Sequence, residues 1–101
     1  MSGDGLPIGD GAIIGPVTVP ITNKRGLHAR ASAKFVTLAS GFDAEVTVAH
    51  DGNSVTGTSI MGLMMLAAAS GDSVELAATG VQADAALAAL VGLIEAKFGE
   101  D

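Results

Sequence analysis

Apolar and polar residues along the chain follow two different periods, and the changes from one to the other predict alternating strands and helices. Stretches in which every second residue is apolar indicate strands with one buried face, and the Asp51-Gly52 pair between two of them is a strong hairpin signal. Stretches in which apolar residues recur every three or four positions indicate helices. The predicted strands are residues 16–22, 44–50, 54–57 and 73–79, and the predicted helices are residues 29–40, 60–68 and 82–98.

The order of these elements predicts the fold class. A βαββαβα chain of 101 residues forms one α+β domain, an open-faced sandwich in which three helices cover one face of a four-stranded antiparallel sheet. Pro20 cannot donate a hydrogen bond to a neighbouring strand, so the first strand is expected at an edge. Residues 1–15 are rich in glycine and are predicted to be a flexible leader, which leaves residues 16–101 as the domain. The last helix should supply a core stripe of Ala83, Leu87, Leu90, Ile94 and Phe98.

Composition narrows the classes of function. Apolar residues make up 49% of the chain, which supports a packed core. Because the chain has no cysteine, disulfides, thiolate zinc sites and thiol nucleophiles are excluded. A formal net charge of -6, without basic residues interleaved with aromatic ones, argues against a nucleic-acid partner. No apolar stretch is long enough to cross a bilayer, and the first residues do not resemble a secretory signal. We therefore expect a cytoplasmic protein, and a monomer because no oligomer signal is present.

The most informative local feature is a cluster of basic residues in this acidic chain. Four of the five Lys and Arg residues fall between positions 24 and 34, with His28 near their centre at a predicted strand-to-helix junction. The free N–H groups of Ala29, Arg30 and Ala31 should point toward an anion at this helix N-terminus, where the helix dipole adds positive charge. The Arg30 guanidinium also matches the geometry of phosphate oxygens. The pattern predicts a phosphate-binding site.

Within this site, spacing alone leaves two interpretations of His28 open. The positive field should disfavour protonation of the ring, and a neutral, reachable imidazole could attack phosphorus and hold a phosphoryl group covalently. The alternative is an ordinary cap or surface histidine. A metal site is not expected, because His50 is the only other histidine and no paired carboxylate lies near His28 in the sequence. No cofactor is expected.

Two motifs resemble those of one family. Residues 26–30, Gly-Leu-His-Ala-Arg, followed by a helix, resemble the phosphohistidine motif of HPr, the small phosphocarrier of the phosphoenolpyruvate-dependent phosphotransferase system. Residues 59–64, Ser-Ile-Met-Gly-Leu-Met, look like the regulatory-serine helix of that family. The spacing of the motifs and the order of the elements agree over about residues 16–98. Ala31 stands where the usual pattern has proline, which resembles the nitrogen-type and alphaproteobacterial carriers and weakens the expectation of sugar transport.

The resemblance implies a role for each matching residue. His28 would accept a phosphoryl group from enzyme I on its Nδ1 atom and pass it to a IIA-type protein, while Arg30 steadies that group. Ser59 would be the site of regulatory phosphorylation by an HPr kinase/phosphorylase. Protein partners would dock on an exposed apolar patch formed by Ile60, Met61 and Met64.

Other interpretations remain open from the sequence. A serine at position 59 is also explained by helix capping alone. The domain could be a regulatory interaction module whose phosphorylation state controls target proteins, with little transport flux. A third possibility, a small ligand-binding domain with an inert histidine, requires a concave apolar pocket, of which the Ala-rich sequence shows no sign. Within the short predicted helix, Met61 and Met64 are expected at the surface, and Leu63 and Leu66 in the core.

Overall fold

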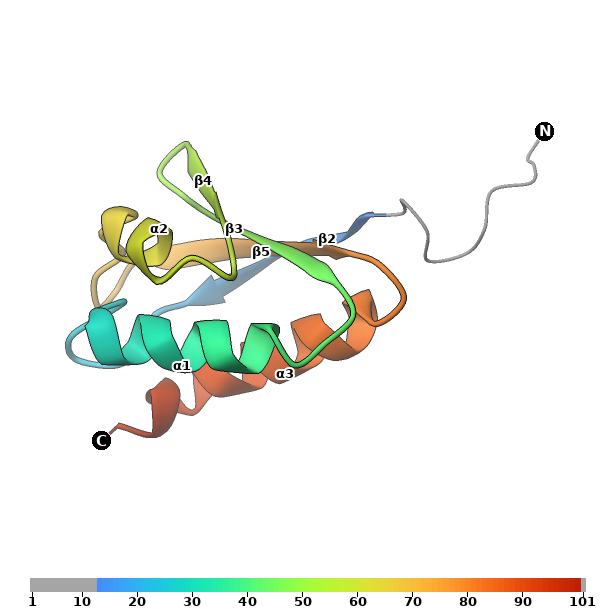
Figure 1. The fold of residues 1–101 in the computed structure, drawn as a ribbon. Coiled ribbons are helices and arrows are strands. Elements are labelled where there is room, and N and C mark those ends of the chain that lie inside the picture. Colours follow the sequence, from blue (N-terminus) through green and yellow to red (C-terminus); the bar gives the residue numbers. More distant parts are fainter. Residues whose placement is uncertain (1–12, 101) are drawn as a thin grey trace.

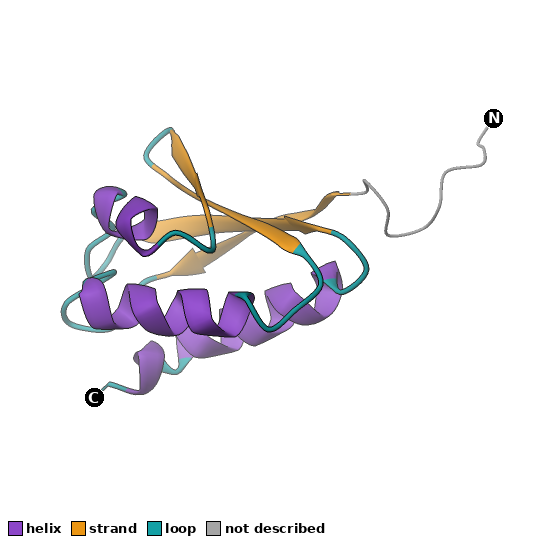
Figure 2. Ribbon diagram, in the orientation of Figure 1, coloured by secondary structure: helices purple, strands orange, loops and turns teal. Residues whose placement is uncertain are grey.

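The computed structural model describes residues 13–100. Its elements follow the predicted βαββαβα order (Figures 1 and 2), which confirms the α+β fold class. The strands are β2 (Ile13–Pro20), β3 (Glu45–His50), β4 (Asn53–Thr56) and β5 (Ser73–Thr79), and the helices are α1 (Ala29–Ala39), α2 (Ile60–Met65) and α3 (Ala83–Glu95), followed by the short 3-10 turn η1 (Lys97–Gly99).

The strands form one antiparallel sheet in the order β2-β5-β3-β4. β2 is therefore an edge strand, as Pro20 indicated. It begins earlier than predicted because Ile13 pairs with Thr79 of β5 and the partly buried Ile14 packs against the core. Residues 13–15 are thus part of β2, and the rest of the predicted leader lies outside the described residues.

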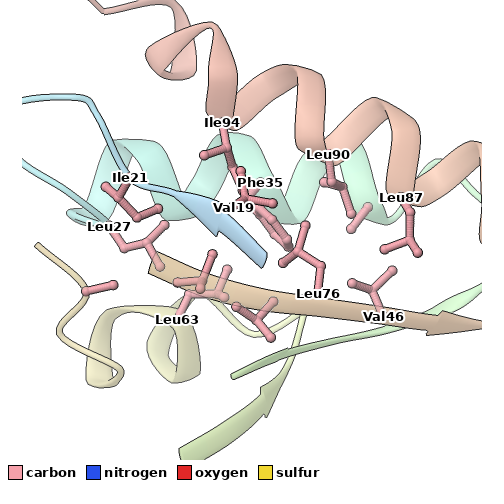
Figure 3. Close-up of a cluster of buried hydrophobic side chains, with 14 of the residues drawn as sticks. Val19, Ile21, Leu27, Phe35, Val46, Leu63, Leu76, Leu87, Leu90 and Ile94 are labelled. Atoms are coloured by element: carbon pink, nitrogen blue, oxygen red, sulfur yellow. The ribbon is translucent and has the colours of Figure 1, made fainter. Parts of the chain in front are cut away.

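The helices form the second layer of the sandwich. α1 and α3 lie side by side across one face of the sheet, and α2 closes the end of this layer against α1 and β4 (Figure 1). Aliphatic side chains and Phe35 fill the space between the layers (Figure 3). Leu63 and Leu66 are buried, as predicted. The predicted stripe of the last helix is buried at all its positions, Ala83, Leu87, Leu90, Ile94 and Phe98.

The end of the chain departs from the predicted last helix. α3 ends at Glu95 rather than at Phe98, because Lys97 and Phe98 have φ of 58° and 56°, outside the right-handed helical region. The turn carries the Phe98 side chain into the core, where none of it is exposed. The Phe98 carbonyl accepts a hydrogen bond from Lys34 Nζ of α1 at 2.7 Å. This anchor brings Glu100 to the N-terminal end of α1.

The loop between β2 and α1 is held against the loop that follows α2. Gly26 has φ of 64°, and a Cβ at this position would lie only 2.3 Å from the carbonyl oxygen of Ala68. The next residue, Leu27, donates its N–H to the same oxygen at 3.0 Å. Such a close backbone approach with positive φ requires glycine, and it fixes the point at which His28 enters α1.

Candidate functional site at the start of helix α1

His28 occupies the N-cap position of α1. Its backbone is extended, with φ of -73° and ψ of 179°, and its Nδ1 atom accepts a hydrogen bond from the N–H of Arg30 at 3.2 Å. The first N–H groups of a helix have no partner within the helix, so a capping side chain supplies one. The first turn consists of Ala29, Arg30 and Ala31, and the structure therefore brings the predicted phosphate-binding residues together beside the imidazole.

The other ring nitrogen faces a carboxylate that sequence reasoning missed. His28 Nε2 lies 2.6 Å from Oε2 of Glu100. Nδ1 accepts an N–H and an ionised carboxylate can only accept, so a neutral ring carries its proton on Nε2. The tautomer is thus set by the two hydrogen-bond partners. The lone pair of Nδ1 is directed toward the start of α1, where free N–H groups can receive an anion.

The carboxylate also changes the predicted surroundings of the ring. Glu100 places a negative charge against His28, in addition to the basic residues that the sequence places around it. Only 14% of the His28 side chain is exposed, since the carboxylate covers its Nε2 edge. Ala29 and Arg30 are exposed, so an anion can still approach along the first turn of α1.

A buried amide holds Glu100 in this position. The Nδ2 atom of Asn23 donates to Glu100 Oε1 at 3.1 Å and to the carbonyl of Gly26 at 2.8 Å. The hydrogen bond from Asn23 lowers the pKa of Glu100, burial opposes this, and the hydrogen bond and charge of His28 and the charge of Lys34 lower it further. The carboxyl is therefore ionised at neutral pH and holds the Nε2 proton.

The second predicted site lies at the start of α2. Ser59 is the N-cap residue, and its Oγ accepts the N–H of Gly62 at 2.9 Å. Capping alone accounts for a serine here. The structure does not bring Ser59 into hydrogen-bond contact with His28, but α2 packs against α1 beside the end that carries His28 (Figure 1).

Helix α2 exposes an apolar surface, here named the α2 patch. The predicted exposure of Met61 and Met64 is confirmed at 71% and 42% of their surfaces. Met65, which the sequence analysis did not assign, is more exposed still, at 78%. Consecutive apolar residues on a short helix cannot all face the core, and those of α2 that face solvent form the patch. It consists of Ile60, Met61, Met64 and Met65.

A shallow apolar hollow, which the sequence pattern did not indicate, lies between α1 and α3. Its volume is about 640 Å³, and it is open to solvent, so it does not enclose a small molecule as ligand pockets usually do. Among residues 13–100, no group of three or more His, Cys, Asp or Glu side chains is arranged to hold a metal ion. No helix in the same part of the chain has the length and hydrophobicity needed to span a membrane. The main apolar residues of the hollow are Ala33, Leu38, Phe42 and Leu93.

The fold and the capping histidine define a class of protein. It is a small open-faced sandwich whose first helix starts at a histidine with an unprotonated Nδ1, an arrangement suited to carrying a phosphoryl group. The sequence pattern described as "PTS HPr component phosphorylation site" matches residues 17–96. The chain belongs to the HPr family of phosphotransferase-system phosphocarriers.

Individual relatives are similar over most of their length. The "Phosphocarrier protein HPr" of Neisseria meningitidis serogroup A is 52% identical over 83 residues, which are 82% of this chain and 93% of the relative. The "Phosphocarrier protein NPr" of Escherichia coli K12 is 46% identical over 85 residues, 83% of this chain and 94% of the relative. The crystal structure of HPr-C-His from Thermoanaerobacter tengcongensis has a TM-score of 0.83 and 46% identity, covering 87% of this chain and 99% of that one. The expected family and fold are confirmed.

Sequence reasoning found the local motif and missed the residues that complete the site. Glu100 lies 72 positions from His28, at the acidic end of the chain, and nothing in its neighbours marks it as a partner of the imidazole. The sequence places Asn23 only in the connection between the predicted strand 16–22 and the predicted helix 29–40. The signal that could have suggested Asn23 is its place in the loop immediately before the motif, where amides often bond to nearby backbone.

Proposed function

We propose that this protein carries a phosphoryl group on Nδ1 of His28, receives it from phosphorylated enzyme I and delivers it to a IIA-type protein. The observation that carries the proposal is the bonding of the imidazole. Nδ1 faces the N–H of Arg30, while Glu100 holds the proton on Nε2. The family to which the chain belongs supports the same conclusion.

The transfer step requires no movement of a proton at His28. The Nδ1 lone pair attacks the phosphorus of the phosphorylated donor, and the new N–P bond forms as the bond from phosphorus to the donor breaks and its electron pair stays with the donor. Phosphoryl oxygens then replace Nδ1 as acceptors for the N–H of Arg30. The N–H groups of Ala29 and Ala31 and the Arg30 guanidinium complete the site for the anion. Delivery reverses these steps.

The partner proteins dock on the α2 patch and on the exposed first turn of α1. Three of the four residues of the patch are methionines, whose flexible side chains can fit more than one partner surface. One surface can therefore meet enzyme I and the acceptor in turn. Substitution of Met61 by Glu should weaken transfer to and from both partners, because it places a charge in the apolar contact.

The test is incubation with enzyme I and phosphoenolpyruvate. The protein should acquire a phosphate that is labile in acid and stable in base, and the variant His28→Ala should acquire none. His50→Ala is the matched control, since His50 is the only other histidine, and it should label normally. An unlabelled wild-type protein, or a labelled His28→Ala variant, would reject the proposal.

We further propose that Ser59 is phosphorylated by an HPr kinase/phosphorylase and that this modification reduces docking. A phosphate is compatible with a helix N-terminus but places about two negative charges beside the α2 patch. Ser59→Asp should slow phosphoryl transfer to His28 without unfolding the domain. Ser70→Asp adds the same charge at an exposed turn residue and should leave the rate unchanged. Equal rates in the wild type and Ser59→Asp would reject the switch.

A second candidate function is favoured by the position of Ser59 on the helix that carries the α2 patch. In this case the protein is a regulatory module, and its phosphorylation state determines which target protein it binds, with little phosphoryl flux. Binding of purified candidate targets to the unmodified, His28-phosphorylated and Ser59-phosphorylated forms distinguishes the two functions. A regulator binds a target that is not a phosphoacceptor in one of these states only, whereas a carrier binds proteins that take its phosphoryl group.

A further inference from the structure

We infer that Glu100 is a positioning residue of the transfer reaction: it keeps the proton on Nε2 of His28 throughout the cycle and so makes the phosphoryl group on Nδ1 ready to leave. The inference rests on the proposed function, in which His28 carries that group. It assigns a role to a residue outside both sequence motifs.

Glu100 is held at both of its oxygens. Oε2 lies 2.6 Å from His28 Nε2, and Oε1 accepts the amide of Asn23 at 3.1 Å. Because the same amide also binds the carbonyl of Gly26, one buried side chain ties the loop before His28 to the end of the chain. A carboxylate held at both ends cannot rotate freely, so its direction relative to the imidazole is fixed.

The structure places an apolar and a polar anchor directly before Glu100. The Phe98 side chain is completely buried, and its carbonyl accepts the hydrogen bond from Lys34 at 2.7 Å.

Asn23 is also completely buried, yet its Oδ1 has no partner within residues 13–100. An unpaired buried oxygen is unfavourable for stability. Asn23 is therefore better explained by the two bonds that its Nδ2 donates than by packing.

The chemistry at the ring follows from these contacts. Before transfer, His28 is neutral, with its proton on Nε2 and its lone pair on Nδ1. When Nδ1 bonds to phosphorus, the ring becomes a cation, because the Nε2 proton stays in place, and the ionised Glu100 compensates this charge. On delivery, the N–P bond breaks, its electron pair returns to Nδ1 and the ring is neutral again. A protonated ring is a better leaving group than one that has lost the Nε2 proton, so the carboxylate promotes delivery.

The basic residues on the elements around His28 act in the opposite direction. Arg30 on the first turn of α1, Lys34 on the next turn and Lys97 in η1 are all cations, as are two residues of the preceding loop. α2, which packs against α1, contributes no charged residue. Glu100 is the one acidic side chain that contacts His28 within the described part of the chain. Its removal should therefore leave the cations uncompensated. The two loop residues are Lys24 and Arg25.

The first test uses the unphosphorylated protein and does not depend on phosphoryl transfer. Nitrogen-15 NMR distinguishes the two neutral tautomers of His28. The wild type should show the form with the proton on Nε2 alone. Glu100→Gln keeps an oxygen acceptor and should keep this form, whereas Glu100→Ala should show a mixture. Glu95→Gln, which removes an exposed carboxylate from the end of α3, is the control and should resemble the wild type. An unmixed Nε2 form in Glu100→Ala would overturn the inference.

The second test measures loss of phosphate from the labelled protein as a function of pH. In Glu100→Gln, the fall in lability that accompanies loss of the Nε2 proton should move to lower pH, since the neutral amide no longer compensates the charge of the phosphorylated ring. Glu95→Gln should show no shift. Superimposable profiles for the wild type and Glu100→Gln would overturn the inference while leaving the carrier function intact. Failure of the wild type to label would instead reject the carrier function.

Discussion

The close contact at Gly26 gives a quantitative prediction about the loop that presents His28. In Gly26→Ala, the new Cβ would lie 2.3 Å from the carbonyl oxygen of Ala68 and 2.8 Å from the Cα of Ala69. Both are backbone atoms, so no side chain can rotate to relieve the clash. The φ of 64° adds a second penalty, because a residue with a Cβ is strained in this region.

Two other glycines separate these effects. Gly52, in the hairpin between β3 and β4, has φ of 82°, but an added Cβ would meet no atom within 4 Å, so Gly52→Ala carries the strain alone, about 1–2 kcal/mol. The clash at Gly26 adds about 1–3 kcal/mol, the usual cost of overpacking, for a total of about 2–5 kcal/mol. Gly92 lies in α3 with nothing within 4 Å of an added Cβ. Gly92→Ala should stabilise the domain by about 0.5–1 kcal/mol through helix propensity.

The assay is thermal and urea unfolding of the three variants, followed by circular dichroism. For a domain of this size, each kcal/mol corresponds to about 4–8 °C in Tm. Gly26→Ala should therefore lose more than about 8 °C, Gly52→Ala less, and Gly92→Ala should gain a few degrees. If Gly26→Ala and Gly52→Ala lose the same stability, the contact with Ala68 neither constrains the loop nor positions His28.

Three further predictions concern the anchors of the two sites. Ser59→Ala should lower the free energy of unfolding by about 1 kcal/mol, because the N–H of Gly62 loses its hydrogen-bond acceptor, and Ser59→Asp should restore most of this loss. Equal stability of Ser59→Ala and the wild type in urea would show that the cap contributes nothing. Phe98→Ala should cost about 3–5 kcal/mol and also loosen Glu100, which hydrogen exchange of the η1 amides would report; unchanged exchange would contradict the coupling. The pKa of Glu100 in the folded protein is lowered below its usual 4.5. The ionised carboxyl therefore stabilises the fold above about pH 4.5, and this stabilisation is lost as the pH falls through the pKa of the folded state. The NMR signals of the Asn23 side-chain amide should therefore stay constant down to pH 4.5 and move only in stronger acid. Movement at higher pH would show that the pKa of Glu100 is not lowered.

The boundaries that the sequence misplaced have physical causes that only packing reveals. The apolar period of the last helix continues to Phe98, yet the helix ends at Glu95, because Phe98 reaches the core from a turn with positive φ. An apolar residue at the helical spacing can be buried whether it lies in the helix or in the turn after it, so the sequence pattern does not show where the helix ends. The start of β2 was also misplaced, since Ile13 is mostly exposed and joins the strand through its pairing with Thr79 rather than through a buried face.

By itself, the sequence determined the fold class, the edge position of β2, the serine cap of α2 and the cluster of basic residues around His28. These features depend on residues close together in the chain, whose periodicity and capping chemistry are readable without a structure. Only the tertiary structure decided that Glu100 meets His28, that Asn23 holds it there, and that the proton of a neutral ring lies on Nε2. The reason is physical: a hydrogen bond between residues 72 positions apart is fixed by how η1 packs against α1, and an acid at the end of an acidic chain carries no local pattern that predicts it.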